Sequence, residues 1–404
     1  MKISLMQGID YWVGIPLCFI FTLWHKARSW LFPLSTARPK KILFIELSEM
    51  GSAVLGYSSL VRAKSEFQGA ELFFLIFKRN RESVDLLEIM PRENVITVRD
   101  ENLFLFSLSL FKALYKIYRL QIDTTIDMEL FSRCTVLISY LSGALNRVGF
   151  HNYTAEGLYR GSLLTHPVLY NPHQHMSLNF LSLLFSLKEP APELPLLKKD
   201  LRRELCSLPL RLPSSDESLA MRERLRAENP KLAGTGEIVL MNPDPGLLPL
   251  RGWPLSHFSA LAAKIIQSRR QALIVTIGLE RSRRYSQAIC QNLPSDNCID
   301  FTGKTESLGE LLVLFSIAKV LVTNDSGPAH LASLVGLRTL VLFGPETPAL
   351  YCPLGDKVTV FYAGLACSPC LAAYNHRRTF CANNRCLQEI QVADVLKAAL
   401  GALK

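Results

Sequence analysis

Short, continuous apolar runs alternate along this chain with segments in which apolar residues recur at helical spacing. Continuous runs of this kind are typical of strands that are buried on both faces of a parallel sheet. We predict strands at residues 42–47, 72–77, 95–98, 124–128, 237–243, 272–277, 320–322 and 339–343. We predict helices at residues 53–67, 83–90, 105–120, 216–228, 255–268 and 310–317. This alternation predicts an α/β protein with doubly wound parallel sheets.

The pattern divides the chain into four parts. Prolines interrupt it between residues 188 and 236, a segment that also contains the charged helix predicted at 216–228. Since clustered prolines break helices and central strands, we interpret residues 188–236 as the connection between two domains. The domains are then two Rossmann-like units at residues 40–187 and 237–404, preceded by an N-terminal arm at residues 1–39. Ligands of such sheets bind beyond the carboxyl ends of the strands.

The arm is apolar and rich in aromatic residues. Its apolar run covers residues 11–24, which is shorter than the roughly 20 residues that a spanning helix needs. Tyr11 and Trp24 stand at the ends of the run, and Lys26 and Arg28 follow it. Aromatic and basic residues in this arrangement are typical of a segment that lies in a membrane interface. A helix packed on the protein's own surface and a single tilted span are the alternatives.

Composition and charge narrow the class of partner. A chain of 404 residues is long enough for two domains of ordinary size. Its net charge of +10 favours anionic partners, such as a phosphorylated substrate, a nucleotide diphosphate or an anionic membrane face. The basic residues are dispersed, and no basic helix, zinc-finger spacing or aromatic RNA-binding box accompanies them. We therefore predict no nucleic-acid partner.

Cysteine usage points to the compartment. The chain has 10 cysteines, too few for its length to form a small secreted disulfide scaffold. No secretory signal with a small-residue cleavage site is evident. We therefore expect a cytoplasmic protein.

The most informative segment is residues 320–348, with the sequence VLVTNDSGPAHLASLVGLRTLVLFGPETP. A strand runs into a turn at residues 324–327, and Pro328 fits the first turn of a short helix that Gly336 ends. The N-terminus of a helix presents free N–H groups and a partial positive charge, and phosphate is its usual ligand. The segment therefore predicts an anion site just beyond the end of a strand.

This segment resembles the nucleotide-sugar-binding half of the glycosyltransferase family 9 enzymes, which include the heptosyltransferases of lipopolysaccharide core assembly. The resemblance rests on the pattern D-[ST]-G-x-x-H followed by L-F-G-P-[TE]-x-P. It implies a GT-B fold, in which two Rossmann-like domains face a central cleft, and a loop that holds the diphosphate of an activated sugar. It thus implies donor-binding roles for Asn324, Asp325, Ser326, Gly327 and His330.

Further donor-site residues follow from the same resemblance. Asn242 begins a turn after a strand, and Arg251 occupies the basic position of the family's [KR]-x-W-P element. A guanidinium stays ionised and grips two phosphate oxygens at once, so Arg251 is our first choice for the charge clamp. Glu280 lies where the family carries an acidic residue near the nucleoside, although a solvated glutamate at a helix start explains it equally well. Thr302 opens the segment T-G-K-T, which resembles a family segment that borders the nucleotide.

Two motifs are absent from the sequence. No D-x-D metal motif stands at a predicted strand end, so we expect no catalytic metal. No G-x-G-x-x-G fingerprint occurs either, which disfavours a nucleotide-sugar epimerase or oxidoreductase. We expect no required cofactor.

Four cysteines near the C-terminus are spaced as two pairs, Cys367-x-x-Cys370 and Cys381-x(4)-Cys386. Four thiolates at such spacing are able to form a tetrahedral zinc site. Free buried thiols or a disulfide pair fit the spacing equally well. In each case we expect the role of these cysteines to be structural.

The family's first domain carries a glycine–aspartate pair after its first strand, and that aspartate serves as the catalytic base. Here Gly51 matches, but Ser52 stands where the aspartate is expected. A serine hydroxyl takes no proton at neutral pH without a partner base. We therefore assign the base to Glu49 in the same turn, and keep Gly51 and Ser52 as acceptor-binding residues.

Asp127 and Glu129, at the end of another predicted strand, are further candidates for the catalytic base. Alternation along the strand places both on one face. Acids at strand ends also cap helices, and this structural alternative stays open for each. Arg147 is a candidate acceptor-binding residue, because with Arg133, Arg160 and His175 it would suit a phosphorylated or carboxylated acceptor if these side chains converge.

Together these observations predict an inverting, metal-independent glycosyltransferase. It would move heptose or a related sugar from a nucleotide diphosphate sugar to a lipopolysaccharide-core or other cell-envelope acceptor. The 40–187 domain would bind the acceptor, the 237–404 domain would bind the donor, and the arm would hold the enzyme on the cytoplasmic face of the inner membrane. The alternative is a non-catalytic relative that binds a nucleotide sugar or glycan and has lost the base, as Ser52 indicates. The donor base, donor sugar and acceptor stay open.

Overall fold

Two compact units make up the chain, Met1–Cys206 and Ser207–Lys404. The computed structural model describes residues 3–31, 38–151, 158–189, 197–229 and 237–404. The division between the units lies within the segment 188–236 that was predicted as a connection. Parts of that segment (190–196 and 230–236) and of the predicted arm (1–2 and 32–37) lie outside the described residues.

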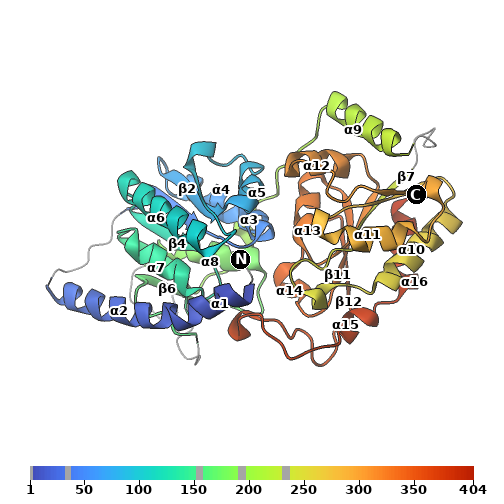
Figure 1. The fold of residues 1–404 in the computed structure, drawn as a ribbon. Coiled ribbons are helices and arrows are strands. Elements are labelled where there is room, and N and C mark those ends of the chain that lie inside the picture. The colour runs from blue at the N-terminus through green and yellow to red at the C-terminus, as the bar shows by residue number, and fades with distance from the viewer. Residues whose placement is uncertain (1–2, 32–37, 152–157, 190–196, 230–236) are drawn as a thin grey trace. The chain divides into compact units, whose positions relative to one another are not determined.

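The first unit is built on a parallel sheet of six strands in the order β3-β2-β1-β4-β5-β6 (Figure 1). The strands are β1 (Lys41–Ile45), β2 (Glu71–Phe77), β3 (Val95–Val98), β4 (Thr124–Asp127), β5 (Asn146–His151) and β6 (His166–Leu169). The two central apolar strands, β1 and β2, are buried along nearly their whole length because helices cover both faces. The strand order reverses between β1 and β4, so the loops that follow these strands flank the place where ligands of such sheets bind.

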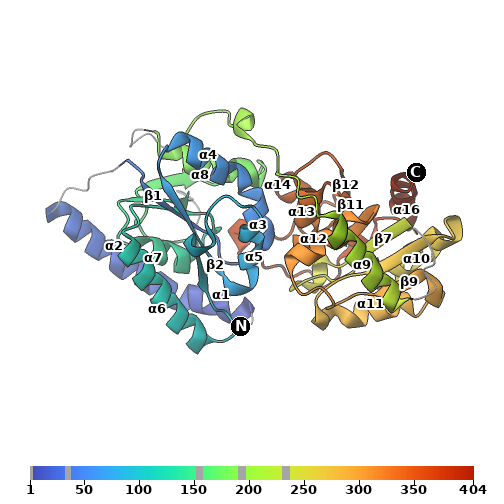
Figure 2. The same ribbon diagram turned by 90° about the horizontal axis from the view of Figure 1, so that it is seen from above.

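Helices form a layer on each face of this sheet (Figures 1 and 2). One layer contains α3 (Met50–Leu55), α4 (Tyr57–Glu66), α5 (Arg81–Asp85) and α8 (Met176–Ser186). The other contains α6 (Leu103–Leu120) and α7 (Arg133–Leu141), together with the arm helices α1 (Ile3–Trp12) and α2 (Gly14–Leu31). Cys18 and Phe21 of α2 pack against Val136 and Leu137 of α7, so the arm lies against the first unit along one of its faces.

The second unit repeats this architecture, with the strand order β12-β11-β10-β7-β8-β9 and parallel pairing throughout. Its strands are β7 (Glu237–Asn242), β8 (Ala272–Thr276), β9 (Cys298–Asp300), β10 (Val320–Asn324), β11 (Arg338–Phe343) and β12 (Val358–Tyr362). The order reverses between β7 and β10. The chain therefore contains two doubly wound Rossmann-like sheets, as the sequence predicts.

Helices cover this second sheet as well. One face carries α10 (Leu255–Ser268), α11 (Arg283–Cys290) and α16 (Val392–Ala402), and the other carries α12 (Leu308–Ser316) and α13 (Gly327–Ala332). Helix α9 (Ser215–Glu228) packs on α12, and the short helices α14 (Pro348–Tyr351) and α15 (Arg385–Gln388) lie in the C-terminal segment. Phe258, Leu261 and Ile265 of α10 fill the core between this helix and the sheet.

The helix predicted at residues 53–67 is wrong as a single element. Helices α3 and α4 divide at Gly56, where a Cβ atom would lie 2.7 Å from the terminal methyl of Met128. The missing side chain lets Met128, in the loop after β4, pack closely against this point. The helix predicted at 83–90 is also wrong in its extent, since α5 ends at Asp85.

The sequence patterns missed several strands, both inside the sheets and at their edges. β5 begins with Asn146 and Arg147, whose polar side chains hide a buried strand from any search for apolar runs. β12 is half-buried along most of its length, so its apolar content does not stand out from a loop. By contrast, α10 and β3 lie where they were predicted, because their apolar pattern decides both their type and their bounds.

Candidate functional site

In the second unit, the loops after β7 and β10 are tied together at the switch point of the sheet. The side-chain N–H₂ of Asn242, the last residue of β7, donates to the hydroxyls of Thr323 at 3.1 Å and Ser326 at 3.2 Å. Asn324, the last residue of β10, accepts from the backbone N–H of Trp253 at 2.9 Å. Asn324 is fully buried, so it holds the two loops together rather than facing solvent. The two loops therefore form one connected surface beyond the strand ends.

Arg251 belongs to this surface, at the end of the 3₁₀ turn Pro249–Arg251. Trp253 is buried, and its indole N–H donates to the carbonyl of Ile390 at 3.1 Å. The side chain of Asn384 donates to the carbonyls on either side of Arg251, at 3.1 and 2.7 Å. These contacts fix the backbone around Arg251, so the fold itself sets the direction of the guanidinium. Asn384 lies far along the chain and carries no motif, which is why the sequence did not reveal it.

The Arg251 guanidinium pairs with the buried carboxylate of Asp325, with 2.8 Å between Nη2 and Oδ2. Oε1 of Glu346 lies 3.8 Å from the same nitrogen. The Nε atom of Arg251 is buried and makes no hydrogen bond to any described residue. The side chain is still 21% exposed, so the guanidinium retains donor capacity for a ligand.

Glu346 is a site residue that the sequence analysis missed, although it is part of the segment L-F-G-P-E. It lies in the loop between β11 and α14 and is 1% exposed. Burial raises the pKa of Glu346 to about 8, against the opposing charge of Arg251. Burial also raises the pKa of Asp325, and the Arg251 guanidinium opposes that rise. This rise favours the neutral form of Glu346, which would lower the repulsion that an anionic ligand meets beside Arg251.

The loop after β10 carries the remaining residues of the predicted diphosphate site. Ser326 stands at the N-cap position of α13 in an extended conformation, but its side chain caps no N–H of the helix. Its hydroxyl is held instead by Asn242 and Thr323. His330 is buried on the same helix. Gly327 is the first residue of α13, so the structure brings Asp325, Ser326 and Gly327 together beside Arg251.

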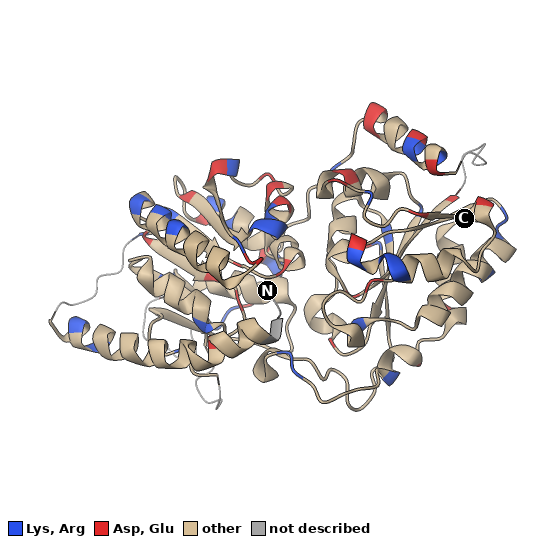
Figure 3. Cartoon of the chain, viewed as in Figure 1, with Lys and Arg blue, Asp and Glu red and all other residues tan. Residues whose placement is uncertain are grey.

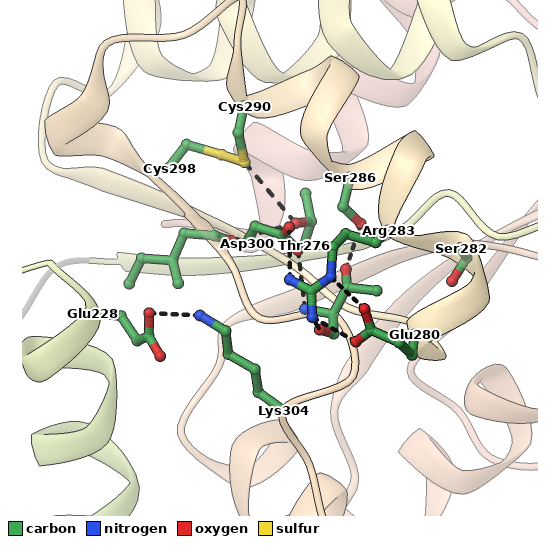
Figure 4. A network of polar contacts seen from close by, with 12 residues as sticks. Glu228, Thr276, Glu280, Ser282, Arg283, Ser286, Cys290, Cys298, Asp300 and Lys304 are labelled. Carbon is green, nitrogen blue, oxygen red and sulfur yellow. Dashed lines mark hydrogen bonds and ion pairs between the residues drawn. A yellow bond between two sulfur atoms is a disulfide. The ribbon is translucent and has the colours of Figure 1, made fainter.

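Glu280 and Thr302 lie beyond the ends of β8 and β9, on the other side of β7 from this loop. Glu280 accepts from Nε of Arg283 at 2.7 Å (Figure 4). Arg283 also donates to the carbonyl of Thr302 at 2.8 Å. The Thr302 hydroxyl is hydrogen-bonded to Ser286 at 2.5 Å. Gly303 has a φ of 72°, and a Cβ there would lie 2.2 Å from the Glu280 carboxylate. Glu280 itself is 68% exposed, which keeps its carboxylate available to a ligand.

The four C-terminal cysteines are free thiols, which excludes a disulfide between them in this structure. The disulfide of the second unit joins Cys290 and Cys298 instead. Burial raises the pKa of Cys386, and Cys370, Cys381 and Cys367 add to the rise. Among the described residues no group of three or more His, Cys, Asp or Glu side chains is placed to hold a metal ion. Structural zinc at Cys367, Cys370, Cys381 and Cys386 therefore stays a prediction.

In the first unit, Glu49, Gly51 and Ser52 lie in the loop and first turn that follow β1. Glu49 is the half-buried N-cap residue of α3, and its side chain caps no N–H of that helix. The Ser52 hydroxyl donates to Oε2 of Glu49 at 3.4 Å, and Gly51 lies beside Ser52 in the first turn. The structure thus pairs the residue that replaces the expected aspartate with the carboxylate that we assigned as the base.

Asp127 and Glu129 are engaged in structural contacts. Asp127 is fully buried, forms an ion pair with Arg160 and accepts from the Thr135 hydroxyl at 2.9 Å. Burial raises the pKa of Asp127 to about 6, although Arg160 opposes the rise. Glu129 accepts from the backbone N–H groups of Leu47 and Ser48 at 3.0 and 2.9 Å. These bonds favour the structural alternative for both carboxylates.

The arginines of the basic set predicted on the acceptor side are bonded within the first unit. Arg147 is buried and donates to the carbonyls of Leu163 at 2.7 Å and Ala144 at 2.6 Å. Arg133 pairs with Asp10 of the arm at 3.2 Å, and Arg160 pairs with Asp127. Each of these guanidiniums is used within the fold, so the geometry favours a structural role for Arg147 over acceptor binding.

A family model described as glycosyltransferase family 9 (heptosyltransferase) matches residues 137–379, which is more than half of the chain. The chain belongs to glycosyltransferase family 9. The matched range includes Arg251, the loop at residues 324–327 and Glu346, so the site described above lies within the family domain.

Among curated proteins, the chain is 31% identical over 132 residues to the lipooligosaccharide heptosyltransferase 2 of Haemophilus influenzae. It is 25% identical over 193 residues to the lipooligosaccharide heptosyltransferase 2 of Campylobacter jejuni. These alignments cover 37% and 56% of the two relatives' own lengths. The detectable sequence similarity is therefore confined to about a third to a half of each relative.

Solved structures extend the similarity in fold to most of the chain. The E. coli ADP-heptose lipopolysaccharide heptosyltransferase II matches with a TM-score of 0.65 and 20% identity, covering 90% of this chain and 98% of that chain. A glycosyltransferase family 9 structure from Veillonella parvula matches with a TM-score of 0.69 and 18% identity, covering 91% and 98%. The fold is therefore of the GT-B type.

The buried carboxyl of Glu346 should make the stability of this family 9 protein depend on pH. Below pH 4.5, the ordinary value, Glu346 is protonated in both the folded and the unfolded chain. As the pH rises toward about 8, the unfolded chain ionises while the folded one stays neutral, so the free energy of unfolding falls. Glu346→Gln keeps the neutral form at every pH, so its stability relative to wild type should rise between pH 5 and 8 by an amount on the order of a few kcal/mol.

Urea unfolding followed by circular dichroism at pH 5, 6.5 and 8 measures this difference. Glu389→Gln, at an exposed position of the same unit, is the matched control and should follow wild type at every pH. Parallel stability curves for wild type and Glu346→Gln would show that the Glu346 carboxyl ionises in the folded protein as it does in the unfolded chain.

Proposed function

We propose that this protein is an inverting, metal-independent glycosyltransferase. It would transfer heptose or a related sugar from a nucleotide diphosphate sugar to a lipopolysaccharide-core or other cell-envelope glycan. The observation that carries the proposal is the cluster of Arg251 with the loop at residues 324–327 at the switch point of the second sheet, within a family 9 domain. ADP-heptose is the first donor to test, because the E. coli structure that this fold matches is named for it.

The second unit would bind the donor. The guanidinium of Arg251, whose Nε hydrogen-bonds to no described residue, would donate to the diphosphate and offset the charge that develops as the sugar–phosphate bond breaks. The neutral carboxyl of Glu346 would donate a further hydrogen bond instead of repelling the phosphates. Glu280 would accept from ribose hydroxyls beyond the end of β8. In this way the leaving group is stabilised by the chain's own residues.

The first unit would supply the base. In an inverting transfer the acceptor hydroxyl attacks the anomeric carbon as the bond to the diphosphate breaks, and its proton passes to a carboxylate. Glu49 is the best candidate, because Asp127 and Glu129 are held by structural bonds. The contact between Ser52 and Glu49 also gives the hydroxyl that replaces the family's aspartate a partner base.

The arm would keep the enzyme at the cytoplasmic face of the inner membrane. The described residues include one helical segment, Leu5–Leu31, that is long and apolar enough by length and composition to cross a membrane. Asp10 in this segment pairs with Arg133 at 3.2 Å, and the Thr22 hydroxyl accepts from the backbone N–H of Ser162 at 2.9 Å. Since spanning the bilayer would break these bonds to the first unit, we propose that the arm lies in the interface.

A thermal-shift screen with ADP-, UDP- and GDP-sugars, followed by a transfer assay, tests the proposed function. A ligand that binds only the native state raises its melting temperature, so the preferred donor should give the largest shift. Release of the free nucleotide diphosphate in the presence of a core oligosaccharide should follow with that donor.

The second candidate is a non-catalytic relative, because Ser52 replaces the family's aspartate. If the protein binds a nucleotide sugar but neither transfers nor hydrolyses any nucleotide heptose or hexose, the non-catalytic alternative is supported.

A further inference from the structure

Helix α6 is apolar on two opposite faces. On its inner face Phe106, Leu110 and Leu114 pack against the core of the first sheet, and Ala113 and Ile117 are buried there. A surface helix normally turns charged or polar residues to the opposite side. In α6 that side is apolar instead, so the burial of the inner face does not account for the sequence of this helix.

The outward residues form a continuous apolar stripe. We define the α6 stripe as Phe104, Leu108, Phe111, Tyr115 and Tyr118. Their spacing alternates between four and three residues, which places all of them on one side of a helix. Phe104, Phe111 and Tyr118 are 75%, 70% and 69% exposed, and Leu108 and Tyr115 are exposed as well. Contiguous exposed apolar surface of this kind marks an interaction site.

Positive charge accompanies the stripe. Lys112, Lys116 and Arg119 are exposed beside it, and α6 contains no Asp or Glu. In Figure 3 the ribbon of α6 carries the blue of Lys and Arg, and its sequence contains no Asp or Glu that would colour it red. An aromatic stripe flanked by basic residues matches the interface of an anionic bilayer, where rings lie at the level of the headgroups and cations meet phosphates.

The α6 stripe lies in the same helical layer as the arm. Met6 of α1 packs against the same apolar cluster as Phe106 and Leu110 of α6. Trp24 and Trp30 of α2 are 64% and 86% exposed. Figures 1 and 2 show α1, α2 and α6 on one side of the first sheet. The arm and α6 thus both carry exposed aromatic residues and lie on the same side of the first sheet.

We propose that the α6 stripe is a second membrane-contacting surface, which docks the first unit on an anionic lipid bilayer beside the arm. This inference rests on the proposed function, because a lipid-linked acceptor places the enzyme's substrate at that bilayer. One interfacial helix leaves the attached unit free to rotate about the helix axis. A second contact on α6 removes this freedom and gives the first unit a defined orientation on the membrane.

Charge argues against a second copy of the chain as the occupant. Two α6 stripes packed together would bring the Lys112, Lys116 and Arg119 side chains of the two copies close to one another. No acidic residue of α6 would offset them, so the contact would be repulsive, whereas lipid phosphates neutralise the same charges.

Co-sedimentation of the full-length protein with vesicles tests the proposal. Vesicles of phosphatidylglycerol and phosphatidylethanolamine present an anionic surface, and phosphatidylcholine vesicles present a neutral one. We expect Phe104→Ser/Phe111→Ser/Tyr118→Ser to weaken the partition onto anionic vesicles by at least about tenfold, because three exposed rings are lost. The matched control, Leu212→Ser/Leu219→Ser/Phe380→Ser, removes three exposed apolar side chains from the second unit and should sediment like wild type. Lys112→Glu/Arg119→Glu should reduce the preference for anionic over neutral vesicles, while Lys26 and Arg28 of the arm keep part of it.

Circular dichroism should show that the triple variant keeps the wild-type fold, since the three side chains are exposed. Wild-type partition by the α6 triple variant would overturn the proposal. So would a wild-type dimer in analytical ultracentrifugation that the triple variant dissociates while vesicle binding stays unchanged, because the stripe would then bind a second copy. Sedimentation requires no turnover, so a protein that binds vesicles through α6 but transfers no sugar would refute the proposed function and support the membrane surface.

Discussion

Replacing Arg251 with alanine should lower the rate of sugar transfer by roughly 10²–10³-fold, the usual cost of removing one donor that stabilises developing charge. The guanidinium is the cation that the structure aims into the surface formed by the loops after β7 and β10, with Trp253 and Asn384 fixing its backbone. The shift in melting temperature produced by the preferred nucleotide sugar should shrink in the same variant, because the diphosphate loses its main contact. Steady-state kinetics and thermal shift measure the two effects.

Loss of stability must be separated from loss of function in this variant. Arg251→Ala leaves the buried carboxylate of Asp325 without its partner, which costs about 3–5 kcal/mol for a broken buried pair. The double variant Arg251→Ala/Asp325→Asn removes the unpaired charge, so its melting temperature should recover while its turnover stays low. Arg338→Ala, an exposed arginine at the start of β11, is the matched control and should behave as wild type. A double variant that regains both stability and turnover would show that Arg251 serves only to neutralise Asp325.

Arg251→Lys tests the geometry of the clamp separately from its charge. A lysine keeps one positive charge but cannot form two parallel hydrogen bonds to phosphate oxygens. Turnover between those of wild type and Arg251→Ala is therefore expected. Full activity in Arg251→Lys would mean that charge alone suffices at this position.

The sequence predicted the fold well wherever the buried positions of a helix or strand are occupied by apolar residues. The strand at residues 95–98 and the helix at 255–268 are such segments, and the structure has them as β3 and α10 with the same bounds. The apolar pattern did not reveal β5, because the burial of this strand depends on polar bonds between distant residues. Asn146 donates to the Thr124 hydroxyl at 3.0 Å, and Arg147 satisfies backbone carbonyls inside the unit. Such partners are set by the tertiary fold and leave no periodic signal in the sequence.

The candidate site was predictable in part for a related reason. A motif shows which residues follow a strand, and the strand order then brings the loops after β7 and β10 together at the switch point. A motif does not show whether a side chain faces a ligand or another part of the protein. Asn324 and Thr302 both lie in predicted donor segments, yet one holds the two loops together and the other bonds Ser286. Glu346 shows the converse, since its importance comes from burial beside Arg251 rather than from its position in a pattern.

Replacing Glu49 with glutamine should lower turnover by roughly 10²–10⁴-fold, the range expected for loss of a general base. An amide of nearly the same shape cannot take the acceptor's proton, while the half-buried position at the start of α3 should tolerate it without loss of fold. Donor affinity should stay at the wild-type value, because every donor-binding residue that we propose lies in the second unit. Kinetics with a saturating acceptor, combined with thermal shift by the donor, measure these two outcomes.

Three further variants decide whether Glu49 or a neighbouring group is the base. Asp127→Asn removes one partner of a buried ion pair, so its main effect should be on stability. The free energy of unfolding should fall by about 3–5 kcal/mol, and the melting temperature should fall with it. Glu129→Gln should likewise lower the stability of the fold, because it weakens the bonds to the backbone N–H groups of Leu47 and Ser48. Ser52→Ala removes the long hydrogen bond to Glu49 but leaves the carboxylate in place, so it should lower turnover less than Glu49→Gln does. Normal turnover in Glu49→Gln, together with inactivity of a fully folded Asp127→Asn, would move the base to Asp127, since a structural role alone cannot abolish turnover while leaving stability intact.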